Sequence, residues 1–171
     1  MGLKRAFIGL AACRDGAKQS ILGASGYCWR LIVFDMDSRL QQDSLVLGDF
    51  PLCRLLLSKD ANYPWFILVP RREGVSELFD LSQEDQAQLW KETTYLAETL
   101  KHAFAADKMN VATLGNVVSQ MHMHVIVRRH GDPAWPAPIW GKVPAAGYAA
   151  EQVDAIRQRL RALLTHDYQE A

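Results

Sequence analysis

The sequence predicts an α+β fold, in which an antiparallel sheet of about five strands carries one long helix and a C-terminal helix. Two observations predict the elements: short apolar or alternating runs between turn residues are typical of strands, and two longer segments repeat apolar residues at helical spacing. A third observation predicts their arrangement. The strands cluster and do not alternate regularly with helices, which disfavours a parallel sheet built from βαβ units.

The first half of the domain is predicted to form, in order, a helix over 37–42 and strands over 44–47, 52–57 and 65–69. Gly48 and Asp49 are expected to form the turn between the first two strands. Pro70 should close the third strand, because proline has no backbone N–H to donate to a sheet. A single helical turn over 76–80 is expected to follow.

Ser82 opens the longest predicted helix, because its side chain can cap the helix and Asp85 follows three residues later. The stripe of this helix that should face the sheet consists of Leu89, Thr93, Leu96, Leu100 and Phe104. Two further strands are expected over 109–114 and 121–127. A second helix over 151–164 has its own stripe, made of Val153, Ile156, Leu160 and Leu163. The segment that contains Pro133, Pro136 and Pro138 cannot be a regular helix or strand, because prolines lack a backbone N–H to donate.

Length and composition limit the classes of function. A chain of 171 residues with 49% hydrophobic and 22% charged residues suits one globular domain with a substantial core. Its 19 basic and 19 acidic residues give no net charge, so no overall field would attract nucleic acid or an anionic membrane. The cysteines Cys13, Cys28 and Cys53 are odd in number and lack a metal-binding spacing, which indicates a reducing, cytoplasmic location. No stretch has the apolar length of a membrane span.

Residues 1–35 differ from the rest of the chain. Glycines interrupt the segment, and Lys4-Arg5 with the later run Leu10-Ala11-Ala12-Cys13 faintly resembles a lipoprotein signal, although its apolar stretch is only about eight residues long. Met36 immediately precedes the first recognisable element and could be the true start. We therefore expect residues 1–35 to be an N-terminal extension, non-native or disordered, and residues 36–171 to form the domain.

The segment over 120–127 alternates polar or ionisable residues with apolar ones, which is a strand pattern of period two. Gln120, His122 and His124 should therefore point to one face. Two imidazoles about 7 Å apart on one strand face can act together on a single small group. Because histidine is both a nucleophile and a proton carrier near neutral pH, these residues are the candidate catalytic residues.

This segment resembles the signature of the histidine triad (HIT) superfamily, in which three histidines are separated and followed by apolar residues. Gln120, His122 and His124 occupy those places, so a glutamine stands where the family has its first histidine. Three further segments resemble the family: 64–72 its strand ending in a proline and basic residues, 110–116 its phosphate-contacting loop, and 135–141 its Trp/Pro segment. The resemblance runs from about residue 37 to 142 and looks closest to bacterial HIT proteins labelled diadenosine polyphosphate hydrolase-like.

The resemblance implies a HIT-like fold and a nucleotide hydrolase or nucleotidyl transferase. Such an enzyme acts at the α-phosphate of a nucleoside phosphate, a dinucleoside polyphosphate or a phosphoramidate, through a covalent nucleotidyl-histidine intermediate. His122 would be the nucleophile, and His124 would bind phosphate oxygens or the leaving group. Gln120 cannot titrate near neutral pH, so it would orient the phosphate or His122 through hydrogen bonds alone.

The remaining candidate residues would bind the substrate. By resemblance, the amides of Asn110 and Asn116 and the backbone N–H groups near Gly115 would hold phosphate oxygens, with Ser119 as a further candidate. Asparagines beside glycine are also common turn formers. Asp60 is the candidate for the ribose hydroxyls, although its place in the run Lys59-Asp60-Ala61-Asn62 also suits a turn.

Two tryptophan sites carry open alternatives. Trp65 stands where many relatives have a fourth histidine, and it forms either an apolar wall of the site or part of the core. Trp135 and Trp140 lie in the proline-stiffened segment, which is either a covering loop or an aromatic wall near the nucleotide.

Two other functions also stay open. The chain could be a nucleotide-binding module that lost turnover together with the first triad histidine, or a Zn-dependent hydrolase, because His-x-His on a strand also suits Zn²⁺. No third ligand has a recognisable spacing, so we expect no metal and no cofactor. We expect a homodimer with a nucleotide as its small-molecule partner. HIT proteins commonly pair through the long helix and an adjoining strand, and the apolar contact would be made by Leu96, Leu100 and Phe104.

Overall fold

The computed structural model describes residues 12–13, 20–22, 28–30 and 34–171, and the chain divides into two compact units, Met1–Asp35 and Met36–Ala171. The first unit contains β1 (Ala12–Cys13), β2 (Ser20–Leu22) and β3 (Cys28–Arg30), which pair in that order as antiparallel strands. The expected disorder of residues 1–35 and the lipoprotein-like segment fall mostly outside the described residues. That the domain does not need residues 1–35 stays a prediction.

The second unit is built on a six-stranded sheet in the order β7-β8-β6-β5-β4-β9, in which every neighbouring pair is antiparallel. The predicted α+β class with an antiparallel sheet is confirmed. The strands are β4 (Ser44–Asp49), β5 (Cys53–Ser58), β6 (Trp65–Pro70), β7 (Lys108–Ala112), β8 (Met123–Arg128) and β9 (Gln169–Glu170). The helices are α1 (Ser38–Asp43), the 3-10 turn η1 (Leu78–Asp80), α2 (Gln83–Ala103) and α3 (Ala150–Leu163).

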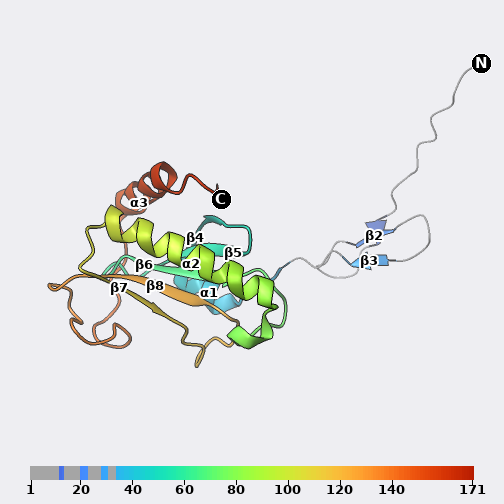
Figure 1. Cartoon of the computed structure of the whole chain (residues 1–171), viewed down its shortest axis with the longest axis horizontal. Helices are drawn as coiled ribbons and strands as arrows, with labels where there is room; N and C mark the ends of the chain where they lie inside the picture. Colours follow the sequence, from blue (N-terminus) through green and yellow to red (C-terminus); the bar gives the residue numbers. More distant parts are fainter. Residues whose placement is uncertain (1–11, 14–19, 23–27, 31–33) are drawn as a thin grey trace, which may run out of the picture. The chain divides into compact units, whose positions relative to one another are not determined.

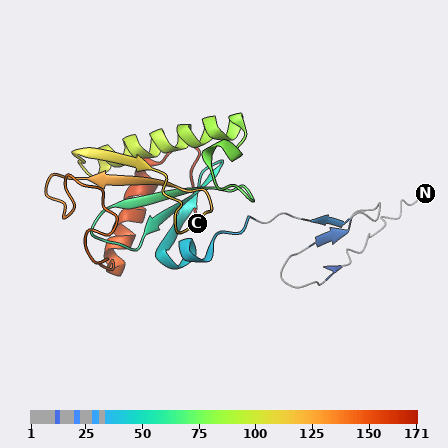
Figure 2. The ribbon, with the colours of Figure 1, turned by 90° about the horizontal axis from the view of Figure 1, so that it is seen from below.

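The long helix α2 lies along one face of the sheet (Figures 1 and 2). It begins where the sequence predicts, since the Ser82 side chain accepts a hydrogen bond from the backbone N–H of Asp85. The predicted stripe is buried, and it packs in one core with alternate residues of β8, namely Met123, Val125 and Val127. Because α2 covers these side chains, the intervening residues of β8 point to the opposite face.

The same burial corrects the expected dimer contact. Leu96 and Leu100 are fully buried and Phe104 is nearly so within this one chain, so they cannot form a surface stripe for a partner. Helical periodicity marks a buried face but does not say whether the chain's own sheet or another chain covers it. The large apolar side chains exposed among the described residues are Phe79, Trp90, Val111, Leu114, Val117 and Leu163.

The predicted turn at Gly48 and Asp49 is wrong, because both residues belong to β4. Gly48 pairs with Glu170 of β9, the short C-terminal strand that adds a sixth member to the sheet. A Cβ on Gly48 would lie 2.3 Å from the backbone oxygen of Gln169, so the close approach of the C-terminal segment requires glycine here. β4 and β5 are joined instead by residues 50–52.

The face of the sheet opposite α2 is covered at β6 and β8 by the segment over 131–143. The buried apolar residues of this layer are Tyr63, Ile126, Ala134 and Ile139, with Trp65, Trp140 and Val143 packed on them. The segment contains no helix or strand, as its prolines predict. It therefore encloses the face of β8 that carries His124.

Helix α3 packs on the same hydrophobic core as α2. Ile156 and Leu160 are buried, whereas Val153 is partly exposed and Leu163 is exposed, so half of the predicted stripe faces the core. Among the described residues, no helix combines the length and the apolar character needed to cross a lipid bilayer.

Candidate active site

The candidate histidines lie where the loop over 113–122 enters β8. The strand begins at Met123, two residues later than predicted, so Gln120 and His122 belong to the loop and only His124 to the strand. The predicted alternation still holds. Met121, Met123 and Val125 enter the core under α2, and the two histidines point to the other face.

His122 is 5% exposed and is held through its ring nitrogen Nδ1. Nδ1 lies 2.7 Å from the backbone oxygen of Gln120. Because a carbonyl oxygen can only accept, Nδ1 carries the hydrogen and donates it. A neutral His122 imidazole therefore keeps its lone pair on Nε2, the nitrogen available to act as a nucleophile.

His124 lies directly behind His122. Their ring centroids are 4.8 Å apart and the rings meet edge to face at 88°. The indole N–H of Trp65 donates a hydrogen bond to Nδ1 of His124 over 3.0 Å. Trp140 closes the other side, with its ring centroid 5.3 Å from that of His124 and 5.8 Å from that of Trp65. Both tryptophans therefore enclose His124.

This enclosure keeps His124 uncharged. His124 is 4% exposed, and its burial, followed by its nearness to His122, lowers its pKa to about 3. The Trp65 hydrogen bond acts in the same direction, because Nδ1 can accept only when it carries no proton. At neutral pH, His124 is a neutral imidazole with its one hydrogen on Nε2.

Gln120 fastens the histidine loop to the start of the second unit. Its Oε1 accepts a hydrogen bond of 2.9 Å from the backbone N–H of Asp37. Asp37 is also the N-cap of α1, where its side chain accepts from the backbone N–H of Arg39. The Gln120 side chain thus connects two segments that are far apart in the sequence. Its amide has no proton that titrates near neutral pH.

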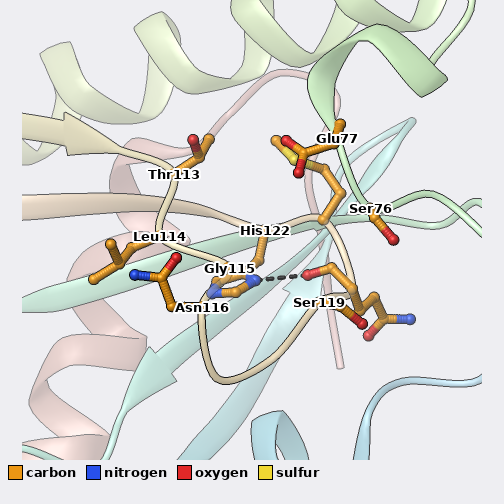
Figure 3. A pocket seen from close by; sticks show the side chains of 10 residues that line it. Ser76, Glu77, Thr113, Leu114, Gly115, Asn116, Ser119 and His122 are labelled. Atoms are coloured by element: carbon orange, nitrogen blue, oxygen red, sulfur yellow. Dashed lines mark hydrogen bonds between the residues drawn. The ribbon is translucent and has the colours of Figure 1, made fainter.

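A cavity of about 270 Å³ lies beside His122. Its walls are formed by Ser76, Glu77, Thr113, Leu114, Gly115, Asn116, Ser119, Gln120, Met121 and His122. Figure 3 shows Thr113, Leu114 and Asn116 on one side of the imidazole and Ser76 and Glu77 on the other. Five of the ten lining residues carry hydroxyl or amide side chains, so the cavity offers hydrogen bonds to an oxygen-rich group such as a phosphate.

The structure therefore brings together five of the predicted site residues at this cavity: Gly115, Asn116, Ser119, Gln120 and His122. His124 and Trp65 stand behind His122 and not among the lining residues. The expected direct contact of His124 with phosphate or leaving group thus finds no support in its position. Its surroundings suit a residue that supports His122.

Asn110 and Trp135 lie in a different cluster, centred on the buried Arg128. The guanidinium donates to Oδ1 of Asn110 over 2.6 Å and makes two hydrogen bonds with the carboxylate of Asp132. The Arg128 guanidinium carbon also lies 5.6 Å from the ring centroid of Trp135. The ring centroids of Trp135 and His130 are 4.5 Å apart. The structure does not bring Asn110 or Trp135 to the cavity, because the buried charge of Arg128 needs these partners.

Asp60 also lies away from the cavity. Its Oδ1 accepts from the backbone N–H and the side-chain amide of Asn62, and from the backbone N–H of Ala146. These contacts are those of a turn residue that anchors the segment before α3. Its surroundings give the ribose role no support.

Sequence reasoning missed Ser76, Glu77 and Thr113 as lining residues and Arg128 as the centre of a buried cluster. Ser76 and Glu77 were expected only in a helical turn. They approach His122 because the backbone N–H of Met121 donates to the carbonyl of Val75. No local pattern predicts this contact. The buried Arg128 had a partial signal, since Asp132 follows it by four residues.

The fold agrees with comparisons to known proteins. A family model described as the HIT domain matches residues 39–131. The chain belongs to the histidine triad family. The matched range includes α2, the cavity loop and β8, and it ends before the tryptophans of the covering segment.

Solved HIT proteins support this membership. A histidine triad protein from Marinobacter aquaeolei VT8 is 45% identical, with 79% of this chain and 98% of that chain covered and a TM-score of 0.76. One from Bradyrhizobium japonicum is 44% identical, with 77% and 98% covered and a TM-score of 0.75. One from Sinorhizobium meliloti 1021 is 42% identical, with 76% and 96% covered and a TM-score of 0.75. No curated protein matches the chain.

The described residues of this HIT protein contain no group of three His, Cys, Asp or Glu side chains that could hold a metal ion. Nδ1 of His122 donates to the Gln120 carbonyl, and Nδ1 of the neighbouring His124 accepts from the Trp65 indole.

Proposed function

We propose that this HIT protein is a nucleotide hydrolase or nucleotidyl transferase in which Nε2 of His122 is the nucleophile. The observation that carries the proposal is the 2.7 Å hydrogen bond between Nδ1 of His122 and the Gln120 carbonyl, at the wall of a polar cavity. This bond fixes the ring and leaves the Nε2 lone pair available for attack. The HIT family includes nucleotide hydrolases and transferases, which supports the same reaction class.

The proposed reaction has two displacements at the α-phosphorus of a nucleotide. Nε2 of His122 attacks this phosphorus in a nucleoside phosphate, a dinucleoside polyphosphate or a phosphoramidate, and the leaving group departs. Water or another acceptor then takes the nucleotidyl group from the histidine. Phosphoryl-type transfer depends mainly on positioning and on stabilising the charge of the equatorial oxygens.

The cavity residues would supply that stabilisation. The amide of Asn116, the hydroxyl of Ser119 and backbone N–H groups near Gly115 are the candidate donors to the phosphate oxygens. His124 would act from behind, by holding the ring of His122 in place. Because these donors can stabilise the charge of the phosphate oxygens, we expect the reaction to need no metal ion.

A nucleotide-binding module without turnover is the second candidate. The observation that favours it is Gln120, whose side chain ties the loop to Asp37 and cannot transfer a proton by changing its charge. Such a module would bind nucleotides in the same cavity, so binding alone does not separate the two functions.

Turnover measured across dinucleoside polyphosphates, nucleoside phosphoramidates and nucleoside phosphates separates them. The proposal expects turnover with at least one class, and His122→Ala should lower it on the order of 10³-fold or more. His102→Ala is the matched control, because His102 is an exposed histidine on α2. Binding without turnover in any class would favour the module. Activity lost to a chelator and restored by added Zn²⁺ would contradict a metal-free reaction.

A further inference from the structure

We propose that this site releases its leaving group without giving that group a proton, so its substrates are nucleotides with a weakly basic leaving group, a phosphate or a carboxylate, and not an alkylamine. The proposal rests on the proposed function, because it concerns the step in which His122 is nucleotidylated. Two residues of this chain carry it: Gln120 at the first triad position and Trp65 behind His124.

Gln120 lines the cavity at the place where the HIT pattern has a histidine. An imidazolium there could protonate a departing amine, whereas a carboxamide is neither acidic nor basic near neutral pH. The side chain is also committed structurally, since its Oε1 accepts from the backbone N–H of Asp37. Gln120 can therefore hold a substrate or a loop, but it cannot act as a general acid.

His124 is prevented from taking over this role. Its Nδ1 accepts from the indole N–H of Trp65 over 3.0 Å, which is possible only for the unprotonated nitrogen. The rings of Trp65 and Trp140 cover it, so water cannot solvate an imidazolium at this place. The hydrogen that remains on Nε2 belongs to a neutral imidazole, which is a very weak acid.

The other lining residues do not replace the missing acid. Besides His122, the cavity lining has one ionisable side chain, the solvent-exposed Glu77, whose carboxylate oxygens accept hydrogen bonds. The remaining polar side chains are hydroxyls and amides, Ser76, Thr113, Asn116 and Ser119. These groups donate hydrogen bonds but do not lose their protons near neutral pH.

The nucleotidylation step is balanced without a proton from the protein. Nε2 of His122 forms a bond to the α-phosphorus with its lone pair, and the bond from phosphorus to the leaving oxygen breaks. The leaving phosphate or carboxylate takes that electron pair and departs as an anion. His122 becomes a cationic nucleotidyl-imidazolium, still donating through Nδ1 to the Gln120 carbonyl. Water then attacks phosphorus, the N–P bond breaks, and one proton passes to solvent.

An alkylamine does not fit this step. It would have to leave as a strongly basic amide anion unless it received a proton first. The rate of nucleotidylation should therefore depend steeply on the basicity of the leaving group.

The test uses aryl esters of a nucleoside monophosphate, built on the nucleoside that gives the fastest turnover in the screen above. The phenols range from p-nitrophenol to unsubstituted phenol, and an alkyl phosphoramidate of the same nucleotide is the most basic member. Release of phenol or amine in a single turnover, with protein in excess over substrate, measures nucleotidylation directly. We expect the rate to fall roughly tenfold for each unit of phenol pKa, and the alkylamine to be released slowest.

Two variants at one position locate the cause. Gln120→His adds an ionisable imidazole, so it should raise release of the alkylamine relative to p-nitrophenol by roughly 10²-fold, the usual contribution of a general acid. Gln120→Leu also loses the contact with Asp37 but adds no acid, so this ratio should not change. A rise in both variants would show that loosening the loop is the cause, and would overturn the assignment to Gln120.

The outcomes of the aryl-ester series distinguish failure of this inference from failure of the proposed function. A flat dependence on leaving-group basicity, with release still present, overturns this inference and leaves the proposed function intact. Failure of every member to release its phenol or amine overturns the proposed function and this inference together.

Discussion

The indole N–H of Trp65 donates to Nδ1 of His124 over 3.0 Å, from β6 to its neighbour β8. The register places Trp65 opposite Ile126 and Ile67 opposite His124, so the indole reaches diagonally along one face of the sheet. This donor fixes the tautomer of His124, and burial of the ring keeps it uncharged.

Trp65→Phe should raise the pKa of His124. Phenylalanine keeps the aromatic cover but removes the donor that requires an unprotonated Nδ1, so the pKa should rise by about one, corresponding to one hydrogen bond. Titration of the His124 ring followed by NMR measures this directly. Trp140→Phe is the matched control, because it trims the other covering ring and leaves the Trp65 donor in place. An equal rise in both variants would show that cover alone sets the pKa.

The stability of the protein should fall as the pH drops from 7 to 5. The pKa of His124 is lowered to about 3 in the folded state, whereas an unfolded histidine titrates near 6.5. Between these values the unfolded chain binds the extra proton, so acid favours unfolding, by roughly 2 kcal/mol at pH 5. Denaturant midpoints at both pH values measure the change. His124→Gln should make this dependence clearly smaller, and an unchanged dependence would contradict the assignment.

Glu92 should be important for the stability of the sheet. Its carboxylate is 3% exposed and accepts from the backbone N–H groups of Leu52 and Cys53, at 2.8 and 2.9 Å. Glu92→Ala leaves these donors buried without partners, which should lower the free energy of unfolding by about 3 kcal/mol. Glu98→Ala, at an exposed position on the same helix, should change it by less than about 0.5 kcal/mol. Urea denaturation compares the two, and equal effects would refute the role of Glu92.

We predict a homodimer that pairs through β7. In the described sheet β7 is an edge strand, and the exposed apolar residues Val111 and Val117 lie on it and on the loop that follows. A second copy would cover both the open edge and these side chains. Light scattering at micromolar concentration should report a dimer, and Val111→Lys should shift it to monomer. Leu163→Lys, on the exposed face of α3, is the control. A monomeric wild-type protein would refute the prediction.

Local and periodic signals were sufficient for much of the fold. Ser82 was identified as a cap because its partner Asp85 is three residues away, and the alternation of β8 separated the histidines from the core. Contacts between distant segments had no such signal. Gly48 reads as a turn residue until the C-terminal strand pairs with it, and the stripe containing Leu96 does not show which surface covers it.

The candidate site likewise contains residues that the motif predicted and contacts that it did not. The HIT pattern identified His122, Gln120 and the loop around Gly115, all of which meet at one cavity. The pattern also suggested Asn110, whose amide is used instead by Arg128. That contact depends on a buried charge eighteen positions away in the chain, and a motif does not specify which polar group will neutralise it.

The most direct test of the account is to identify the atom that carries the nucleotidyl group. The protein is mixed with a nucleotide labelled at its α-phosphate, quenched within the first turnover and digested for peptide mapping. We predict one acid-labile, base-stable phosphoramidate on His122, absent in His122→Ala and present in the control His102→Ala. A label on any other residue, or near-normal turnover by His122→Ala, would contradict the mechanism.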